Sequence, residues 1–181
     1  MNRKFAILMA VVAIAVTSAV AGMNNPVVGG QEMYPTKNII ENAVNSADHT
    51  TLVAAVKAAG LVETLEGAGP FTVFAPTNEA FAKLPAGTVD TLLKPENKPT
   101  LTKVLTYHVG RLSASDLKKQ IKAGKGTAEL TTVEGGKLWA TAKGNHIILK
   151  DEKGGTTWVT IPNVFQSNGV IHVVDAVLMP N

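Results

Sequence analysis

The first half of the chain places its apolar residues at helical spacing. The period of three to four residues predicts helices in three stretches, and the residues of their buried faces are Ile39, Ile40, Ala43 and Val44, then Leu52, Val53, Val56 and Ala59, then Leu101, Val104 and Leu105. Asn38 is placed to cap the first helix, either Asp48 or Thr50 the second, and Gly60 ends the second. A shorter helix is expected over Thr88–Leu93, and a polar loop over Pro95–Pro99.

One segment, FTVFAPTNEAFAKLP, changes its period abruptly at its centre. Residues Phe71 to Ala75 alternate over a β-branched and aromatic run, which predicts a strand. Pro76 cannot donate to a sheet ladder, so the strand should end there. Thr77 can then cap a helix with Phe81 on its inner face, and such a corner needs no reactive role.

The second half reads as a series of strands separated by turns rich in Gly or Asn. The expected strands are 128–133, 137–142, 146–150, 156–161 and 170–178. Before them, Ser113 and Ser115 precede Asp116-Leu117-Lys118, which predicts another capped turn. Helices first and antiparallel strands afterwards predict an α+β domain in place of an alternating parallel sheet.

The N-terminus has the parts of a secretory signal peptide. Arg3 and Lys4 precede an apolar run over residues 5–16, and Ala19-Val20-Ala21 provides small residues for cleavage. We therefore expect a signal peptide at 1–21, a leader at 22–35 and one domain at 36–180. An uncleaved anchor is the less favoured alternative, and no further membrane span follows the signal. The protein should be exported, to the periplasm or beyond the cell.

Charge and cysteine content narrow the classes of partner. Loss of Arg3 and Lys4 changes 17 basic against 14 acidic residues to 15 against 14, so the net charge falls from +3 to +1. A nucleic-acid partner is not expected, because basic stripes and arginine forks are absent. The densest lysine group (Lys118, Lys119, Lys122 and Lys125) is interpreted as a solvated helix face. With no cysteine, neither disulfides nor lipid attachment at a cysteine is available.

No local pattern predicts catalysis or a cofactor. The four histidines, His49, His108, His146 and His172, lack metal-ligand spacing, and no nucleophile elbow occurs. His108 and His172 stand among apolar neighbours, which favours core imidazoles whose nitrogens are hydrogen-bonded. Asp175 is interpreted as a strand-end carboxylate bonded to nearby groups. A hydrolase built from His172, Asp175 and a distant serine remains only a formal alternative.

Three segments together resemble the fasciclin domain family. They are the 71–85 segment, Tyr107-His108, and NGVIHVVDAVLMP near the C-terminus, in the order and separation of that family. The chain is similar to small, single-domain, exported bacterial members, which include a mycobacterial secreted antigen. The motif residues are Phe71, Thr72, Val73, Phe74, Ala75, Pro76, Thr77, Asn78, Phe81, Asn168, Gly169, Val170, Ile171, His172, Val174 and Asp175.

The resemblance implies a wedge-shaped fold, with two small β-sheets and a helical cluster from the N-terminal half. It implies that the strand at Phe71 lies near the segment 170–178. It also implies adhesion or extracellular binding without catalysis, to a cell-surface or matrix protein or polysaccharide, with Tyr107 and His108 as candidate partner-binding residues. The alternative is a carrier of a small apolar ligand, a lipid or haem, in a cleft lined by Met33, Trp139 and Trp158.

Overall fold

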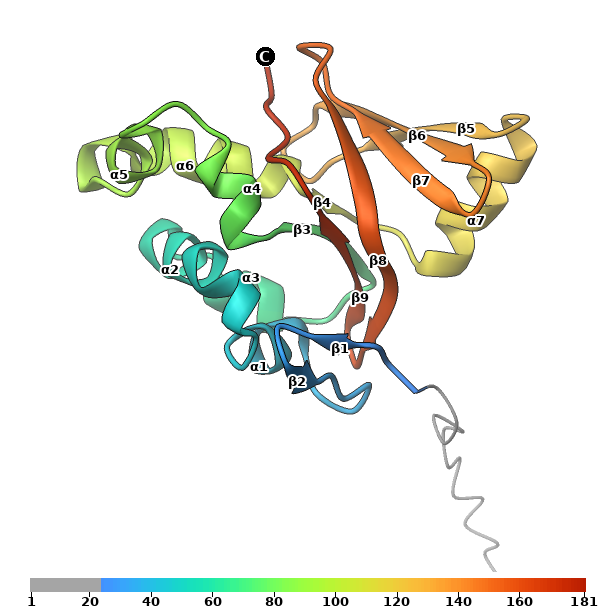
Figure 1. Cartoon of the computed structure of the whole chain (residues 1–181), viewed down its shortest axis with the longest axis horizontal. Coiled ribbons are helices and arrows are strands. Elements are labelled where there is room, and N and C mark those ends of the chain that lie inside the picture. Colours follow the sequence, from blue (N-terminus) through green and yellow to red (C-terminus); the bar gives the residue numbers. More distant parts are fainter. Residues whose placement is uncertain (1–23) are drawn as a thin grey trace, which may run out of the picture.

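The structure, a computed structural model, describes residues 24–181, so the predicted signal peptide lies outside the described residues. Helices dominate the first part of the chain (Figure 1). They are α1 (Ile39–Ala43), the 3-10 helix η1 (Ala47–His49), α2 (Thr50–Ala59), α3 (Val62–Glu66), α4 (Asn78–Ala82), α5 (Thr88–Leu92), the 3-10 helix η2 (Pro95–Asn97), α6 (Lys98–Tyr107) and α7 (Ala114–Ala123). Among residues 24–181, none of the helices is both long and apolar enough to cross a membrane.

Seven strands form one mixed sheet in the order β4-β3-β9-β8-β7-β6-β5. Their bounds are β3 (Phe71–Pro76), β4 (Val109–Gly110), β5 (Thr127–Thr131), β6 (Lys137–Lys143), β7 (His146–Lys150), β8 (Thr156–Gln166) and β9 (Gly169–Val174). Only β3 and β9 run parallel, and the other neighbours are antiparallel. The predicted α+β class is confirmed.

The expectation of two small β-sheets is wrong for this chain. The strand β8 extends for 11 residues and pairs with β7 through its first residues and with β9 through the rest. Two register shifts between Val159 and Val164, together with a positive φ of 59° at Asn163, bend this strand. Bulges of this kind turn a sheet without breaking it, so two expected sheets become one curved sheet.

The two edge strands of the curved sheet meet, which nearly closes it into a barrel. Gly110 in β4 forms a bridge to Thr132, directly after β5. The backbone N–H of Val133 also donates to the carbonyl of Val109 at 2.7 Å. Closure removes free strand edges, which otherwise present unpaired backbone groups to other chains.

The sheet separates two apolar cores. On one side, α1, α2, α3 and α6 cover residues such as Val73 and Ile171. On the other side, Phe74 and Val174 face a second core that α7 completes with Leu117. Every residue of β3 is therefore buried, although its side chains alternate as predicted. Alternate side chains of β3 enter the two different apolar cores, as in a strand that is covered on both faces.

Most predicted helix ends are found in the structure. Asn38 and Ser113 each form a capping box, with Glu41 and Asp116 respectively, and Gly60 ends α2 with a left-handed conformation at φ 73°. The second helix differs from the prediction, because neither Asp48 nor Thr50 caps it; Asn78 of α4 supplies that bond, as described below. The predicted loop over Pro95–Pro99 is instead η2 and the first turn of α6, since proline is well suited to a first helical turn.

The described part of the expected leader packs against the sheet. It forms the hairpin of β1 (Val27–Val28) and β2 (Gln31–Glu32). The Asn25 amide donates to the carbonyl of Phe165 at 2.7 Å and accepts from the Phe165 N–H at 2.8 Å. Met33 is buried in the helical core. These contacts attach the segment to β8.

Candidate functional site

The two long motif segments lie side by side at the centre of the sheet. The strands β3 and β9 are parallel, with Phe71 opposite Gly169 and Pro76 opposite Val174. The Phe74 N–H also donates to the carbonyl of His108 at 2.9 Å, which brings the third segment to the same place. All three motif segments, which lie between Phe71 and Pro180 of the chain, therefore belong to one structural unit.

At the end of β3, Thr77 caps α4 as predicted. Its hydroxyl accepts from the N–H of Ala80 at 3.1 Å. The next residue, Asn78, reaches outside its own helix: its side-chain oxygen accepts from the N–H of Thr51 at 3.0 Å, and its amide donates to the carbonyl of Ala47 at 2.9 Å. This corner thus fixes two helix starts at once, and the Asn78 side chain is used to join them.

Tyr107 is fully buried beneath the β6–β7 end of the sheet. Its hydroxyl donates to the carbonyl of Lys137 at 2.6 Å and accepts from the N–H of Glu152 at 3.1 Å. Burial raises the pKa of this phenol to about 12, so it stays protonated. Its proton is held by a backbone carbonyl, and the side chain offers no exposed atom to a partner.

His108 is buried as well, with both ring nitrogens hydrogen-bonded. Its Nδ1 lies 2.8 Å from the carbonyl of Val104, and its Nε2 accepts from the N–H of Leu178 at 2.9 Å. Burial lowers the pKa of His108 to about 4, so the ring is neutral at pH 7. The imidazole joins α6 to the C-terminal segment, and whether it contributes to partner binding stays a prediction.

His172 lies on β9, directly opposite Phe74 in the parallel β3–β9 pair, whereas His108 bonds Phe74 from the β4 side. The rings of Phe74 and His172 stack with their centroids 5.7 Å apart and an interplanar angle of 24°. Its Nδ1 accepts from the N–H of Asn163, whose left-handed backbone forms the bend of β8, at 3.2 Å. Burial lowers the pKa of His172 to about 4, and its Nε2 has no hydrogen-bond partner among residues 24–181. The ring therefore supports the bend as a neutral aromatic group.

Asp175 follows β9, and its carboxylate accepts two hydrogen bonds and forms one ion pair. Its carboxylate takes the Thr157 hydroxyl and the Trp158 N–H, each at 2.8 Å, and lies 3.6 Å from the Lys83 ammonium. Partial burial raises the pKa of this carboxyl, but these donors outweigh it and hold the pKa below its usual value. His172 and Asp175 make no hydrogen bond to each other, so the hydrolase alternative gains no support.

Asn168 holds the turn before β9 against the helices. Its side-chain oxygen accepts from the N–H of Ile39 at 3.1 Å, and its amide donates to the carbonyls of Leu65 and Gly67 at 2.7 and 2.9 Å. Gly169 beside it is needed for space, because a Cβ there would collide with the carbonyl of Phe71. The motif pair therefore sets how closely β9 approaches β3 and α3.

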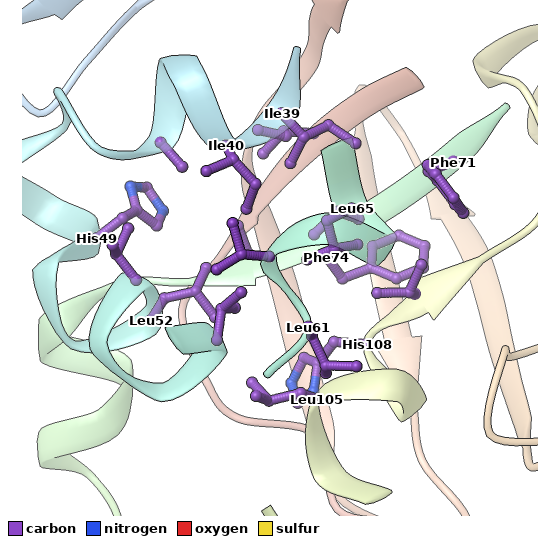
Figure 2. Close-up of a pocket in the computed structure, with 18 of the residues that line it drawn as sticks. Ile39, Ile40, His49, Leu52, Leu61, Leu65, Phe71, Phe74, Leu105 and His108 are labelled. Atoms are coloured by element: carbon purple, nitrogen blue, oxygen red, sulfur yellow. The ribbon is translucent and has the colours of Figure 1, made fainter. Parts of the chain in front are cut away.

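An apolar cavity lies between the helices α1–α3, α6 and the strands β3 and β9 (Figure 2). Its volume is about 60 Å³, and side chains such as Ile40, Leu52 and Leu105 form its wall. A water molecule needs about 10–15 Å³ on this measure, whereas pockets for drug-sized ligands measure about 300–1,000 Å³. The cavity accommodates a small apolar molecule only, unless the helices move.

Two histidines belong to the wall of this cavity. Figure 2 shows the His49 ring directed toward the other lining side chains, with His108 at a separate place in the wall. His49 Nδ1 lies 2.9 Å from the Ser46 hydroxyl, and Nε2 is buried without a hydrogen-bond partner among the described residues. Burial lowers the pKa of His49, so its ring is neutral at pH 7 and is one of the few polar groups in a mainly apolar wall, together with Ser46 and His108.

The cleft that the carrier hypothesis expected is not assembled as proposed. Met33 does line the apolar cavity, but Trp139 and Trp158 do not. Trp139 borders a separate, open hollow, and Trp158 is 40% exposed. Within residues 24–181, no group of three or more His, Asp or Glu side chains is placed to hold a metal ion.

Comparison with known sequences decides the family. The sequence model of the Fasciclin domain matches residues 47–180. The chain belongs to the fasciclin domain family. This domain is 48% identical over 144 residues to protein sll1483 of Synechocystis, covering 78% of this chain and 73% of that protein. It is also 38% identical to the immunogenic protein MPB70 of Mycobacterium bovis, covering 76% of this chain and 66% of that protein.

More distant relatives contain the domain within much longer chains. Human periostin is 32% identical over 134 residues, which are 74% of this chain and 15% of periostin. Among solved structures, the FAS1 domain pair of the insect cell adhesion molecule fasciclin I superposes with a TM-score of 0.67 at 17% identity. That match covers 79% of this chain and 51% of the insect chain, so this chain spans about half of that pair. Fasciclin domains are a family of adhesion and binding modules that is generally non-catalytic.

Proposed function

We propose that this fasciclin domain is an exported, non-catalytic binding module that attaches to a component of the cell envelope or extracellular matrix. The observation that carries the proposal is how the motif residues are used. Tyr107, His108 and His172 are at most 2% exposed, and Asp175 is bonded to Thr157 and Trp158. The titratable side chains of the motifs therefore stabilise the fold. Binding is left to the exposed surface residues.

The relatives and the N-terminus support the same proposal. One structural neighbour is named as an insect cell adhesion molecule. Residues 1–21 of this chain have the composition of a signal peptide, from which we infer export to the periplasm or the medium. A role for Tyr107 and His108 in partner binding stays a prediction. With both side chains buried, it would act through the surface residues that they hold in place.

A pull-down tests the proposal directly. The processed chain, purified from its host, is immobilised and exposed to that host's envelope fraction and extracellular polymer. We expect retention of a protein or polysaccharide that a heat-unfolded sample of the same chain does not retain. Absence of any retained component at high micromolar protein concentration would remove the support for a binding module.

The apolar cavity favours a second candidate, the carrier of a small apolar ligand. Its wall is apolar apart from Ser46, His49 and a few polar neighbours, and His49 Nε2 is an unused polar atom within it. At about 60 Å³ it is too small for haem or an acyl chain as it stands, so α1–α3 would have to move away from β3. Native mass spectrometry of host-purified protein distinguishes the two, since a stoichiometric small molecule favours the carrier.

A further inference from the structure

The sheet has one large face that faces solvent. On the strands β5 to β8, α7 covers the inner side, where Leu117 and Ile121 share a core with Leu130 and Leu138. The opposite side chains of the same strands are exposed or half-buried. In Figure 1, α7 lies along one side of these strands. The outer face therefore has room for a partner.

Both tryptophans of the chain lie on this outer face. Strand pairing places Trp139 opposite Lys150 and Trp158 opposite Ile148, while Lys143 pairs with His146. We call these six residues the tryptophan face: Trp139, Lys143, His146, Ile148, Lys150 and Trp158. The strands β6 and β8 are two strand spacings apart, about 10 Å, and the indoles are also offset by two residues along the strands. The two rings are therefore separate platforms.

The Trp158 indole is 40% exposed but held in place. The His146 ring meets it edge-on, with centroids 5.9 Å apart and an interplanar angle of 73°. The Lys143 ammonium lies 5.8 Å from the centre of the indole ring. The indole, with the His146 ring at an edge contact and an ammonium group over its ring, offers an apolar surface and a positive charge to a ligand that has an apolar surface and a negative charge.

An open hollow of about 440 Å³ lies beside Trp139, bordered by Lys150 and the loop residues 151–154. The carboxylates of this loop are already used. Asp151 accepts from the N–H groups of Gly155 and Met179 at 2.6 and 3.0 Å, and Glu152 accepts from the N–H groups of Lys137 and Asn181 at 2.9 and 3.3 Å. The hydroxyl of Tyr107 holds the loop from below. The hollow thus brings the Trp139 indole and two lysines together beside a loop that is held by hydrogen bonds.

The lysines of this face are not neutralised by the protein itself. Within residues 24–181, no carboxylate lies within 4.0 Å of the ammonium groups of Lys143, Lys150 or Lys153. The nearby Glu129 instead pairs with Lys137 at 2.7 Å. Two indoles therefore lie among three lysines that form no ion pair within the described part of the chain, while the neighbouring carboxylates of Glu129, Asp151 and Glu152 are paired with Lys137 or hydrogen-bonded to backbone N–H groups.

We propose that the tryptophan face binds an acidic polysaccharide, a refinement that rests on the binding-module proposal. The C–H faces of pyranose rings stack on aromatic side chains, and ammonium groups pair with carboxylate or sulfate substituents. A protein partner fits less well, because interface centres are depleted in lysine and this face has one large aliphatic side chain, Ile148. The lysines of α7 carry charge without an aromatic platform, so they are not the primary site.

The test is calorimetric titration of the full chain, as purified from its host, with alginate and dextran sulfate oligomers as acidic probes and dextran as the neutral one. We expect saturable binding to at least one acidic probe, weakened by salt, and none to dextran. Trp158→Ala should weaken binding at least roughly tenfold, as loss of a central aromatic contact does. Lys143→Gln combined with Lys150→Gln should weaken it similarly. Because both tryptophans lie on this face, intrinsic fluorescence of the unmodified chain should change in parallel.

Matched controls separate this face from general charge attraction. Tyr34 is also exposed, at 45%, with the Lys37 ammonium 4.8 Å from its ring centre, so Tyr34→Ala removes a similar pair elsewhere and should leave binding unchanged. Lys118→Gln combined with Lys122→Gln removes two charges from α7 and should also have little effect. Trp158 is at the surface, and unchanged circular dichroism and unfolding midpoint would show that its variant is folded.

Several outcomes would overturn the proposal. They are equal binding by Trp158→Ala, equal binding of dextran, loss of binding in the α7 double variant alone, or no binding to either acidic probe. The binding-module proposal fails separately, since it requires retention of envelope or matrix material in the pull-down. If wild type and Trp158→Ala retain the same material there, the module stands and the tryptophan face is not its site.

Discussion

The Nε2 atom of His108 accepts a hydrogen bond from the backbone N–H of Leu178 at 2.9 Å, across 70 residues of chain. Because Nε2 is the acceptor, the ring proton sits on Nδ1, which donates to the carbonyl of Val104. Protonation of Nε2 would place a donor against the Leu178 N–H inside a buried core. The C-terminal segment of the fasciclin domain therefore depends on a neutral imidazole.

The first prediction is a loss of stability in mild acid. The folded pKa of His108 and of His172 is about 4, against 6.5 for an unfolded histidine, and that of His49 is also lowered. Below pH 6.5 the unfolded chain binds protons that the folded chain does not, so the free energy of unfolding falls as the pH drops from 6.5 toward 4. Each histidine contributes about 1.4 kcal/mol per pH unit at most.

Urea unfolding at a series of pH values measures this loss. The variant His108→Gln should show a shallower dependence, by about one proton, whatever its stability at pH 7. His146→Gln, at an exposed position, is the matched control. A free energy of unfolding that stays constant between pH 7 and 4.5 would show that the buried rings accept protons without cost.

The second prediction concerns the turn before β9. Asn168→Asp is close to isosteric, but it replaces an amide that donates to the carbonyls of Leu65 and Gly67 with a carboxylate oxygen. We expect the free energy of unfolding to fall by about 2–4 kcal/mol, because two partly buried carbonyl acceptors lose their donor and face a negative charge. Asn45→Asp, at an exposed site with one local bond to Glu41, should cost under about 1 kcal/mol. Comparable losses in both variants would contradict the role assigned to Asn168.

Helix caps that depend on neighbouring residues could be predicted from the sequence, whereas contacts between distant residues could not. The caps at Asn38, Thr77 and Ser113 were predictable because each depends on residues within one helical turn. The cap of α2 was not, because its acceptor Asn78 comes 27 residues later. Pro162 and Asn163 look like the end of a strand, yet His172 stabilises the bend and β8 continues through it.

The candidate site follows the same division. The motif segments identified the centre of the sheet. Trp139, however, was expected to line a cleft, although the alternation of its strand places it on a polar face. Trp139 alternates with Leu138 and Ala140, and this pattern becomes informative only once α7 is known to cover the leucine side. Pairing across the three strands β6, β7 and β8 then brings Trp158 onto the same face, which no single segment of sequence specifies.

The third prediction separates a long-range cap from a local one. Asn78→Ala leaves the N–H of Thr51 and the carbonyl of Ala47 without their partner, and it loosens α4 from α2. We expect a loss of about 2 kcal/mol, against about 1 kcal/mol for Asn38→Ala, which removes one local capping bond. Amide hydrogen exchange should locate the change, with faster exchange at the start of α2 in Asn78→Ala only. Faster exchange confined to α4 would contradict the shared role.

The fourth prediction uses the buried phenol. Tyr107→Phe keeps the ring but removes the hydroxyl that bonds the carbonyl of Lys137 and the N–H of Glu152. Two backbone groups lose their partner, so the free energy of unfolding should fall by about 1–3 kcal/mol, and exchange at the Glu152 amide should accelerate. The matched change Tyr34→Phe removes an exposed hydroxyl bonded to Glu32 and should cost little. If both variants were equally stable, the Tyr107 hydroxyl would not be holding the loop that borders the hollow beside Trp139.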